Sequence, residues 1–299
     1  MKITDLLRHA SERHEPVFSF EFFPPKTEAG VEALFQSIAA LRPLAPAFVS
    51  VTWGAGGTIG GRSLEIVSRI EKEAELTAMA HLTCSGATAA ELKATLEAFR
   101  GAGIDNVLLL RGDPPRGQRS FTAHPDGFSY ANELVALAKS LEGKPLCIGG
   151  ACYPEGHVEQ RDRLSDLKNL KNKVEAGAQF LITQLFFDNR AYFEFVDRAR
   201  AAGIDCPIIP GIMPITNVDQ VERFTAMCGA SVPPALHAAM KVRRDDPDAA
   251  LQLGVAWATL QCADLLRRGA PGIHFYTLNR SPATRAILAA QRAMEPWRG

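Results

Sequence analysis

The chain has 299 residues, of which 46% are hydrophobic and 22% are charged, and its 33 basic residues equal its 33 acidic ones. This composition is typical of a globular protein with a core, and the zero net charge gives no support to electrostatic binding of nucleic acid or of an anionic membrane. No apolar run reaches the length of a membrane span, and residues 1–16 lack the apolar stretch of a signal peptide.

Eight short β-rich runs follow one another along the chain. They are 17–22, 47–52, 77–83, 105–111, 145–151, 179–186, 207–212 and 272–278. Between the runs lie amphipathic segments with apolar residues at helical spacing, for example 31–44, 88–103 and 164–179. The alternation of strand and helix predicts a parallel sheet.

The spacing of the runs points to a barrel. Most of them begin about thirty residues apart, the length of one βα unit. Eight such units predict an α/β fold of the (β/α)8 TIM-barrel type, with one domain over 1–299. The interval between the seventh and eighth strands, about 213–271, is longer, and we expect extra helix there, notably in 231–250. An open doubly wound sheet is the alternative, but no G-x-G-x-x-G motif follows a strand, and the glycines of 53–61 have another spacing.

The cysteines and histidines show no metal-binding pattern. The six cysteines are scattered without a C-x-x-C pair, which indicates reduced thiols in a cytoplasmic protein. The seven histidines lack metal-ligand spacing, and the H-E-x-x-H motif is absent. We predict that the protein binds no metal.

Polar residues end most of the apolar strands. In a (β/α)8 barrel the active site lies at the C-terminal ends of the strands, so these residues would share one rim. Strand ends also commonly meet solvent, which is the simpler explanation for any single position. Glu21 and Gln184 fit that explanation less well, because large apolar residues flank each of them in the sequence.

Two carboxylates are candidates for catalysis. Burial disfavours the ionised form of a carboxyl group, so a glutamate in apolar surroundings, as expected for Glu21, can hold a proton and donate it as a general acid. The alternative for Glu21 is a structural partner of a buried arginine or lysine. Asp113 precedes Pro114, which fixes the turn, and it is either a catalytic carboxylate or only a turn former.

Eight segments resemble, in the same order, those of the methylenetetrahydrofolate reductase family in its bacterial (MetF) type. The segments are SFEFFPPK, SVTWGAGG, HLTC, LLLRGDPP, 153–173, ITQLFFD, IIPGIMPI and HFYTLNR. The resemblance covers nearly the whole chain, and the combination of SFEFFPPK, RGDPP, TQLFFD and FYTLNR is specific.

The resemblance implies a barrel flavoprotein with non-covalent FAD and with NADH or NADPH as co-substrate, NADH being favoured by analogy. It implies reversible, ping-pong reduction of 5,10-methylenetetrahydrofolate to 5-methyltetrahydrofolate, a step of one-carbon metabolism and methionine biosynthesis. The family forms homo-oligomers, so a dimer or tetramer is expected. Because the chain ends soon after the eighth strand, we expect it to lack the C-terminal regulatory domain of the eukaryotic form.

The resemblance also implies roles for individual residues. Glu21 matches the general acid that would protonate N10 of the folate and open its ring to a 5-iminium cation, and Asp113 matches an aspartate near the flavin and the pterin. The positions that match FAD contacts are Thr52, His81, Arg111, Gly112, Asp113, Ala131, Tyr153, His157, Asp166, Asn169 and Lys173. Substrate contacts are implied for Gln184, Gln220, Phe224 and Arg280. The chain departs from close relatives at Asn172 and Gln160, near the adenosine-diphosphate end of FAD, and more mildly at Trp53.

Three other functions stay open on the sequence. A flavin barrel related to proline dehydrogenase would lack the SFEFFPPK and FYTLNR pair. A non-catalytic flavin- or folate-binding subunit would have no need of the acid Glu21. A barrel of this family that works without flavin conflicts with the near-complete set of FAD positions, and a yellow colour of the purified protein would distinguish it.

Overall fold

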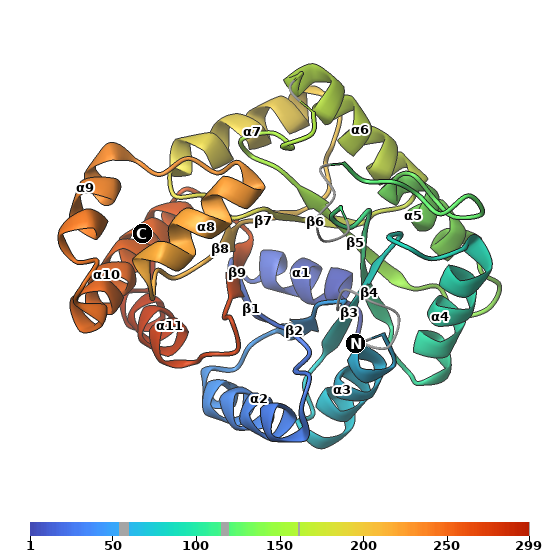
Figure 1. Ribbon diagram of the computed structural model, residues 1–299, viewed down its shortest axis with the longest axis horizontal. Coiled ribbons are helices and arrows are strands. Elements are labelled where there is room, and N and C mark those ends of the chain that lie inside the picture. The colour runs from blue at the N-terminus through green and yellow to red at the C-terminus, as the bar shows by residue number, and fades with distance from the viewer. Residues whose placement is uncertain (54–59, 115–119, 161, 299) are drawn as a thin grey trace.

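Nine parallel strands form a nearly closed barrel with helices around it (Figure 1) in the computed structural model, which describes residues 1–53, 60–114, 120–160 and 162–298. The predicted (β/α)8 barrel is confirmed. The strands run in the order β7-β6-β5-β4-β3-β2-β1-β9-β8 around the sheet. Their bounds are β1 Val17–Phe22, β2 Phe48–Val51, β3 Ala78–Thr83, β4 Asn106–Leu110, β5 Cys147–Cys152, β6 Phe180–Thr183, β7 Ile208–Ile209, β8 Gly211–Ile212 and β9 Gly272–Tyr276.

The seventh predicted strand, 207–212, is two short strands, so the prediction of one continuous strand is wrong. Pro210 separates β7 from β8, and a proline nitrogen has no hydrogen to donate to a neighbouring strand. β7 pairs with β6, whereas β8 pairs with β9. The two pieces therefore lie at the two ends of the sheet, where the barrel closes.

Apart from α1, which precedes β1, the helices follow strands and cover the outside of the barrel (Figure 1). Side-chain caps begin several of them, including the Thr88–Glu91 capping box of α4 and the Asp162 cap of α6. Three helices, α8 to α10, lie between β8 and β9. The bounds are α1 Ile3–Glu12, α2 Glu28–Leu41, α3 Gly60–Glu73, α4 Ala89–Gly101, α5 Ala131–Ser140, α6 Arg163–Ala176, α7 Asn189–Ala201, α8 Val218–Cys228, α9 Pro234–Val242, α10 Pro247–Arg267 and α11 Pro282–Met294, with 3-10 helices at Arg42–Leu44 and Pro296–Arg298.

Within the described part of the chain, α10 is the one helix that is long and apolar enough to cross a membrane. No such run was predicted from the sequence. The helix packs against α7, α9 and α11, and its buried side chains include Ala258, Cys262 and Leu266. A core helix of a soluble protein meets the same length and composition test, so the absence of a membrane partner stays a prediction.

Both faces of β1 are buried, and they differ in character. Side chains alternate across a strand, so Phe18, Phe20 and Phe22 lie on one face and belong to the cluster that contains the buried face of α2. Val17, on the other face, belongs to an inner cluster with Phe48 and residues of the other strands. Ser19 and Glu21 share the face of Val17, which puts both of them inside the barrel.

α1 covers the N-terminal end of the barrel, and it lies across the centre of the ring of strands in Figure 1. Its buried Ile3, Leu7 and Ala10 pack on the inner cluster. Asn106, fully buried at the start of β4, accepts a hydrogen bond from the Ile3 backbone at 2.8 Å. Its amide nitrogen donates to the Met1 and Ala78 carbonyls. The amide of Asn106 therefore ties the N-terminus to the sheet.

Asn106→Ala is expected to lower the free energy of unfolding by about 2–3 kcal/mol, because it removes three hydrogen bonds and leaves a cavity and unpaired buried groups. Urea denaturation measures this change. Asn172→Ala, at an exposed position of α6, is the matched control, with an expected change within about 0.5 kcal/mol. Equal stability of the two variants would contradict the anchoring role of Asn106.

Candidate active site

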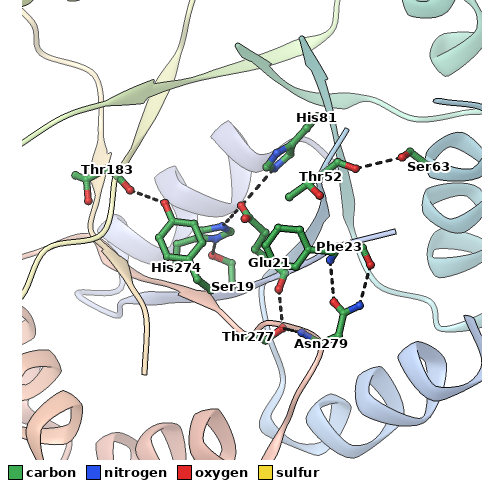
Figure 2. A network of polar contacts seen from close by, with 11 residues as sticks. Ser19, Glu21, Phe23, Thr52, Ser63, His81, Thr183, His274, Thr277 and Asn279 are labelled. Atoms are coloured by element: carbon green, nitrogen blue, oxygen red, sulfur yellow. Dashed lines mark hydrogen bonds and ion pairs between the residues drawn. The ribbon is translucent and has the colours of Figure 1, made fainter. Parts of the chain in front are cut away.

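Glu21 lies inside the barrel between two imidazole rings (Figure 2). Its Oε2 is 3.3 Å from Nε2 of His274 on β9 and 3.6 Å from Nε2 of His81 on β3. The three side chains are buried, with exposures of 7% for Glu21, 3% for His81 and 0% for His274. A carboxyl group and two titratable rings thus share a site with little access to water.

The register of the sheet produces this arrangement. Ser19 is the partner of His274 across the β1–β9 pair, and Glu21 is the partner of Tyr276. The Ser19 hydroxyl oxygen lies 2.8 Å from Nδ1 of His274. Ser19, His274, Glu21 and His81 therefore form one chain of polar contacts across the inside of the barrel (Figure 2).

The surroundings of Glu21 differ from those expected on the sequence. Its neighbours in the sequence are phenylalanines, but Phe20 and Phe22 point to the opposite face of the strand. The contacts of the carboxyl group itself are with His81 and His274. Among the described residues, no arginine or lysine forms an ion pair with Glu21. The alternative that Glu21 is the structural partner of a buried arginine or lysine is therefore not supported by these residues.

His81 is neutral at physiological pH. Burial lowers the pKa of its imidazole to about 4, although the nearby Glu21 acts in the opposite direction. Within the described part of the chain, its buried Nε2 makes no hydrogen bond. A buried polar atom without a partner is uncommon in native proteins and is a point at which a ligand can be bound.

Tyr276 closes one side of this site. Its hydroxyl donates a 2.6 Å hydrogen bond to the Thr183 carbonyl, and its ring meets the His274 ring edge-on at a centroid distance of 5.5 Å. Burial raises the pKa of the Tyr276 phenol, which therefore stays protonated. The absence of a side chain at Gly211 makes room for the Tyr276 hydroxyl. A Cβ atom at position 211 would lie 2.7 Å from that hydroxyl and 2.3 Å from the Thr183 carbonyl oxygen.

The segment after β9 is fastened to the segment after β1. The Thr277 hydroxyl donates to the Glu21 carbonyl at 2.6 Å. The Asn279 side chain accepts from the Phe23 N–H and donates to the Phe23 carbonyl, both at 2.8 Å. Leu278 and Asn279 have φ values of 52° and 59°, in the left-handed region. Sterically unfavourable backbone of this kind persists where surrounding contacts fix it, and it is common at functional sites.

Arg111 and Gly112 follow β4 at the rim. The Arg111 guanidinium makes two hydrogen bonds to Glu159, at 2.8 and 2.7 Å, and it stacks on Phe121 at 4.8 Å from the ring centroid. Gly112 has φ 93°, and a Cβ atom there would lie 3.0 Å from Ser85 and 3.1 Å from Thr83. Glycine is therefore required at position 112, and it leaves the backbone open to close approach.

A second group of titratable side chains follows β5. The rings of Tyr153 and His157 meet edge-on with centroids 4.6 Å apart. Lys173, on α6, donates to the Ala151 carbonyl at 2.7 Å. Burial raises the pKa of Tyr153 and of Asp166, and it lowers the pKa of His157 and of Lys173. Clusters of perturbed groups in one region are typical of functional sites.

The other predicted site residues are more dispersed. Asp113 is exposed, and its charge contributes to the raised pKa of Tyr153, but no described contact joins Asp113 to Glu21. Gln184 lines a small cavity with Tyr153. Asn169 and Arg280 are exposed, Thr52, Gln220 and Phe224 are partly buried, and Ala131 is buried. At the departures from the relatives, Asn172 is exposed and Gln160 and Trp53 are partly buried.

Four residues of the site were not predicted from the sequence, namely Ser19, His274, Tyr276 and Glu159. The run GIHFYTL carried a usable signal, because His274 and Tyr276 alternate with apolar residues at strand spacing. Ser19 and Glu21 alternate in the same way on β1. Glu159 carried no comparable signal, since its partner Arg111 lies 48 positions away.

One cavity in the described part of the molecule lies away from these residues. It has a volume of about 360 Å³ and is lined by Phe187, Asp188, Asn189, Pro233, Trp257, Leu260 and Gln261. None of the predicted site residues borders it. The strand ends hold the paired carboxyl and imidazole groups, so we place the candidate active site there on chemical grounds.

The family model of methylenetetrahydrofolate reductase matches residues 6–292. Methylenetetrahydrofolate reductase (NADH) 1 of Arabidopsis thaliana is 41% identical over 96% of this chain and 50% of its own length. The 5,10-methylenetetrahydrofolate reductase of Escherichia coli is 39% identical over 90% of this chain and 88% of its own length. The chain therefore spans about half the length of the plant and fungal relatives it matches and most of the bacterial ones.

One solved structure adds to the evidence on the fold. It is an uncharacterized protein from Clostridium thermocellum that binds two copies of 5-methyl-5,6,7,8-tetrahydrofolic acid. The two folds agree with a TM-score of 0.63 at 16% sequence identity, over 97% of this chain and 99% of that one. At this identity the likeness concerns the fold alone.

Proposed function

The chain belongs to the methylenetetrahydrofolate reductase family, and on that premise we propose that it reduces 5,10-methylenetetrahydrofolate to 5-methyltetrahydrofolate at the expense of NADH or NADPH. The reaction is reversible, and the proposed cofactor is non-covalent FAD. When bound, FAD supplies the hydride acceptor and donor that lets two substrates use one site in turn. NADH is the favoured donor, since the Arabidopsis relative is named for it.

The observation that carries the proposal is the buried carboxyl group of Glu21 at the inside of the barrel. It lies against His274 and His81 with an exposure of 7%. A carboxyl group in a site with little water is suited to hold a proton and to release it to one bound atom. We assign Glu21 as the general acid that protonates N10 of the folate.

The residues at the strand ends fit FAD. Gly112 has no side chain and a left-handed backbone, so a cofactor can approach its main chain closely. The buried Nε2 of His81 has no hydrogen-bond partner among the described residues. Lys173 provides positive charge for a pyrophosphate, whereas the Arg111 guanidinium is already paired with Glu159. Three further groups, the side chains of Tyr153 and His157 after β5 and of Asp166 at the start of α6, are available for polar or stacking contacts.

The remaining chain residues act by binding and orienting in this proposal. Gln184 presents an amide with both donor and acceptor to a pterin, and Phe224 presents an aromatic ring to either substrate. Gln220 and Arg280 supply further substrate contacts. The cytoplasmic location and the assembly into a homo-oligomer stay predictions, as does the absence of nucleic acid and membrane partners.

An anaerobic stopped-flow experiment on the purified protein tests the proposal. Mixing with NADH is expected to bleach the visible flavin absorbance, and subsequent mixing with methylenetetrahydrofolate is expected to restore it. Bleaching without recovery would reject the folate reaction. A protein with no flavin absorbance after addition of FAD would instead support the barrel that works without flavin.

Asp113→Asn is expected to raise the flavin reduction potential and to slow folate reduction. The negative charge of Asp113 opposes the addition of electrons nearby and stabilises a cationic intermediate. Asp113 is exposed, so its screened interaction is worth about 1 kcal/mol, which corresponds to roughly 20 mV for a two-electron couple. A redox titration measures the shift, with Asp126→Asn at another exposed position as the control. An unchanged potential would remove the electrostatic role.

A further inference from the structure

We propose that Ser19 and His274 are positioning residues that hold one oxygen of the Glu21 carboxyl group and leave the other to carry the catalytic proton. The inference deepens the proposed function and rests on it, because it concerns the proton that Glu21 donates. Both imidazole contacts reach Oε2 of Glu21. In the described part of the chain, no hydrogen bond or ion pair engages Oε1 (Figure 2).

The contact with Ser19 bears on whether Nε2 of His274 donates or accepts a hydrogen bond at Glu21. A neutral imidazole has one N–H, so one ring nitrogen donates and the other accepts. Nδ1 of His274 lies 2.8 Å from the Ser19 hydroxyl. When that hydroxyl donates to Nδ1, the ring proton is on Nε2, which then donates to Oε2 of Glu21 across 3.3 Å. An ionised Glu21 carboxylate can only accept hydrogen bonds, so it favours the Nε2–H tautomer, and the Ser19 hydroxyl supports that tautomer by donating to Nδ1.

This tautomer serves both protonation states of Glu21. Oε2 accepts from His274 whether the carboxyl group is ionised or neutral, so the group need not rotate during turnover. In the protonated state the proton is on Oε1. In the opposite tautomer, the lone pair of Nε2 would draw the proton to Oε2, where it would face His274 rather than the substrate.

The proton transfer balances without a redox partner. The O–H bond at Oε1 breaks, its electron pair stays on the carboxylate, and an N–H bond forms at N10 of the folate. The carboxylate later regains a proton from water. His274 and Ser19 keep their own protons throughout, which is why they are positioning residues.

The groups that face Glu21 come from the two neighbours of β1, which are β2 and β9, and from β3. They are Ser50 on β2, His81 on β3, and His274 with Tyr276 on β9. Among these, the titratable groups are the two imidazoles and the phenol. His81 contacts the same oxygen as His274 but at 3.6 Å, which is beyond a normal hydrogen bond. Of the two rings, His274 therefore makes the closer contact with Oε2.

A comparison of Ser19→Ala with Ser19→Thr, which keeps a hydroxyl, tests the inference. Ser19→Ala is expected to slow the reoxidation of NADH-reduced enzyme by folate about tenfold or more, as part of the general-acid effect is lost. The pH profile of this step should differ from that of wild type, since Nε2 can then accept a hydrogen bond from the protonated carboxyl group. Reduction of the flavin by NADH and the folate KM should change less than twofold, and Ser19→Thr should keep the wild-type pH profile.

Substitution of His274 gives a second test. It separates the effect of losing the N–H donor from the effect of changing the tautomer of the ring. His274→Gln supplies an N–H donor that has no tautomers, so it should retain more of the folate step than His274→Leu. Adding Ser19→Ala to His274→Gln should then cause little further loss, whereas independent effects would multiply. Multiplying effects, or equal losses in the NADH and folate steps, would overturn the proposal in favour of a general structural role.

Nitrogen-15 NMR of the histidine-labelled protein reports the tautomer without any catalytic turnover. Wild-type His274, assigned by the signal lost in His274→Gln, is expected to carry its proton on Nε2, and Ser19→Ala is expected to show a mixture. A wild-type Nδ1–H ring would overturn the inference. Failure of the wild-type enzyme to reduce methylenetetrahydrofolate would reject the proposed function instead, since the NMR result does not depend on it.

Discussion

Glu21→Gln is expected to slow the reduction of methylenetetrahydrofolate by about 10²- to 10⁴-fold, the usual contribution of a general acid, while NADH still reduces the bound flavin. Glutamine has the shape of glutamate, and its amide oxygen can still accept the hydrogen bond from His274, so the local packing is kept. The variant lacks the acidic proton that the folate nitrogen needs. Single-turnover mixing of NADH-reduced enzyme with methylenetetrahydrofolate measures the loss.

The control for this substitution is Glu75→Gln, which makes the same chemical change at a surface ion pair with Arg42. Both half-reactions of that variant should match wild type. If Glu21→Gln reduced folate at the normal rate, the assignment of Glu21 as general acid would be wrong. If it lost FAD and both half-reactions, Glu21 would serve mainly to hold His81 and His274 in place.

The fold could be predicted from local patterns, and its one error has a local cause. Strand runs of regular spacing with helices between them follow from hydrophobic periodicity, and a closed parallel barrel is the usual outcome of eight such units. The run 207–212 is apolar throughout, so its periodicity gave no reason to divide it. Pro210 was the one sign of a break, because a proline nitrogen has no hydrogen to donate to a neighbouring strand.

The site was predicted less completely, because its contacts are set by register rather than by sequence distance. The residues that flank Glu21 in the sequence lie on the far face of β1, whereas His274 reaches it from 253 positions away. Period-two alternation shows which side of a strand a residue faces. It does not show which residue of the neighbouring strand lies opposite, and for Ser19 and His274 that pairing creates the site.

Lys173→Met is expected to weaken FAD binding by about 10- to 100-fold, the effect of one lost hydrogen bond to a charged group, without lowering the stability of the cofactor-free protein. The stem of Lys173 packs close to Gly150, and methionine can fill much of the same space. Burial lowers the pKa of the Lys173 ammonium. In the cofactor-free folded protein, the charged form of Lys173 is therefore less favourable than in the unfolded chain. Removing that charge should leave the free energy of unfolding equal or higher at neutral pH.

The sign of this stability effect also sets its pH dependence. A lysine whose pKa is lowered in the folded state destabilises the fold at pH values below that pKa, and the cost fades as rising pH removes the proton from the folded state. Titration with FAD and urea unfolding of the cofactor-free protein measure the two quantities, with Lys168→Met, at an exposed position of the same helix, as the control. Unchanged FAD affinity together with reduced stability would make Lys173 a structural residue that ties α6 to Ala151 on β5. Reduced affinity with unchanged or increased stability would mean that this buried cation is stabilised by the phosphates it binds.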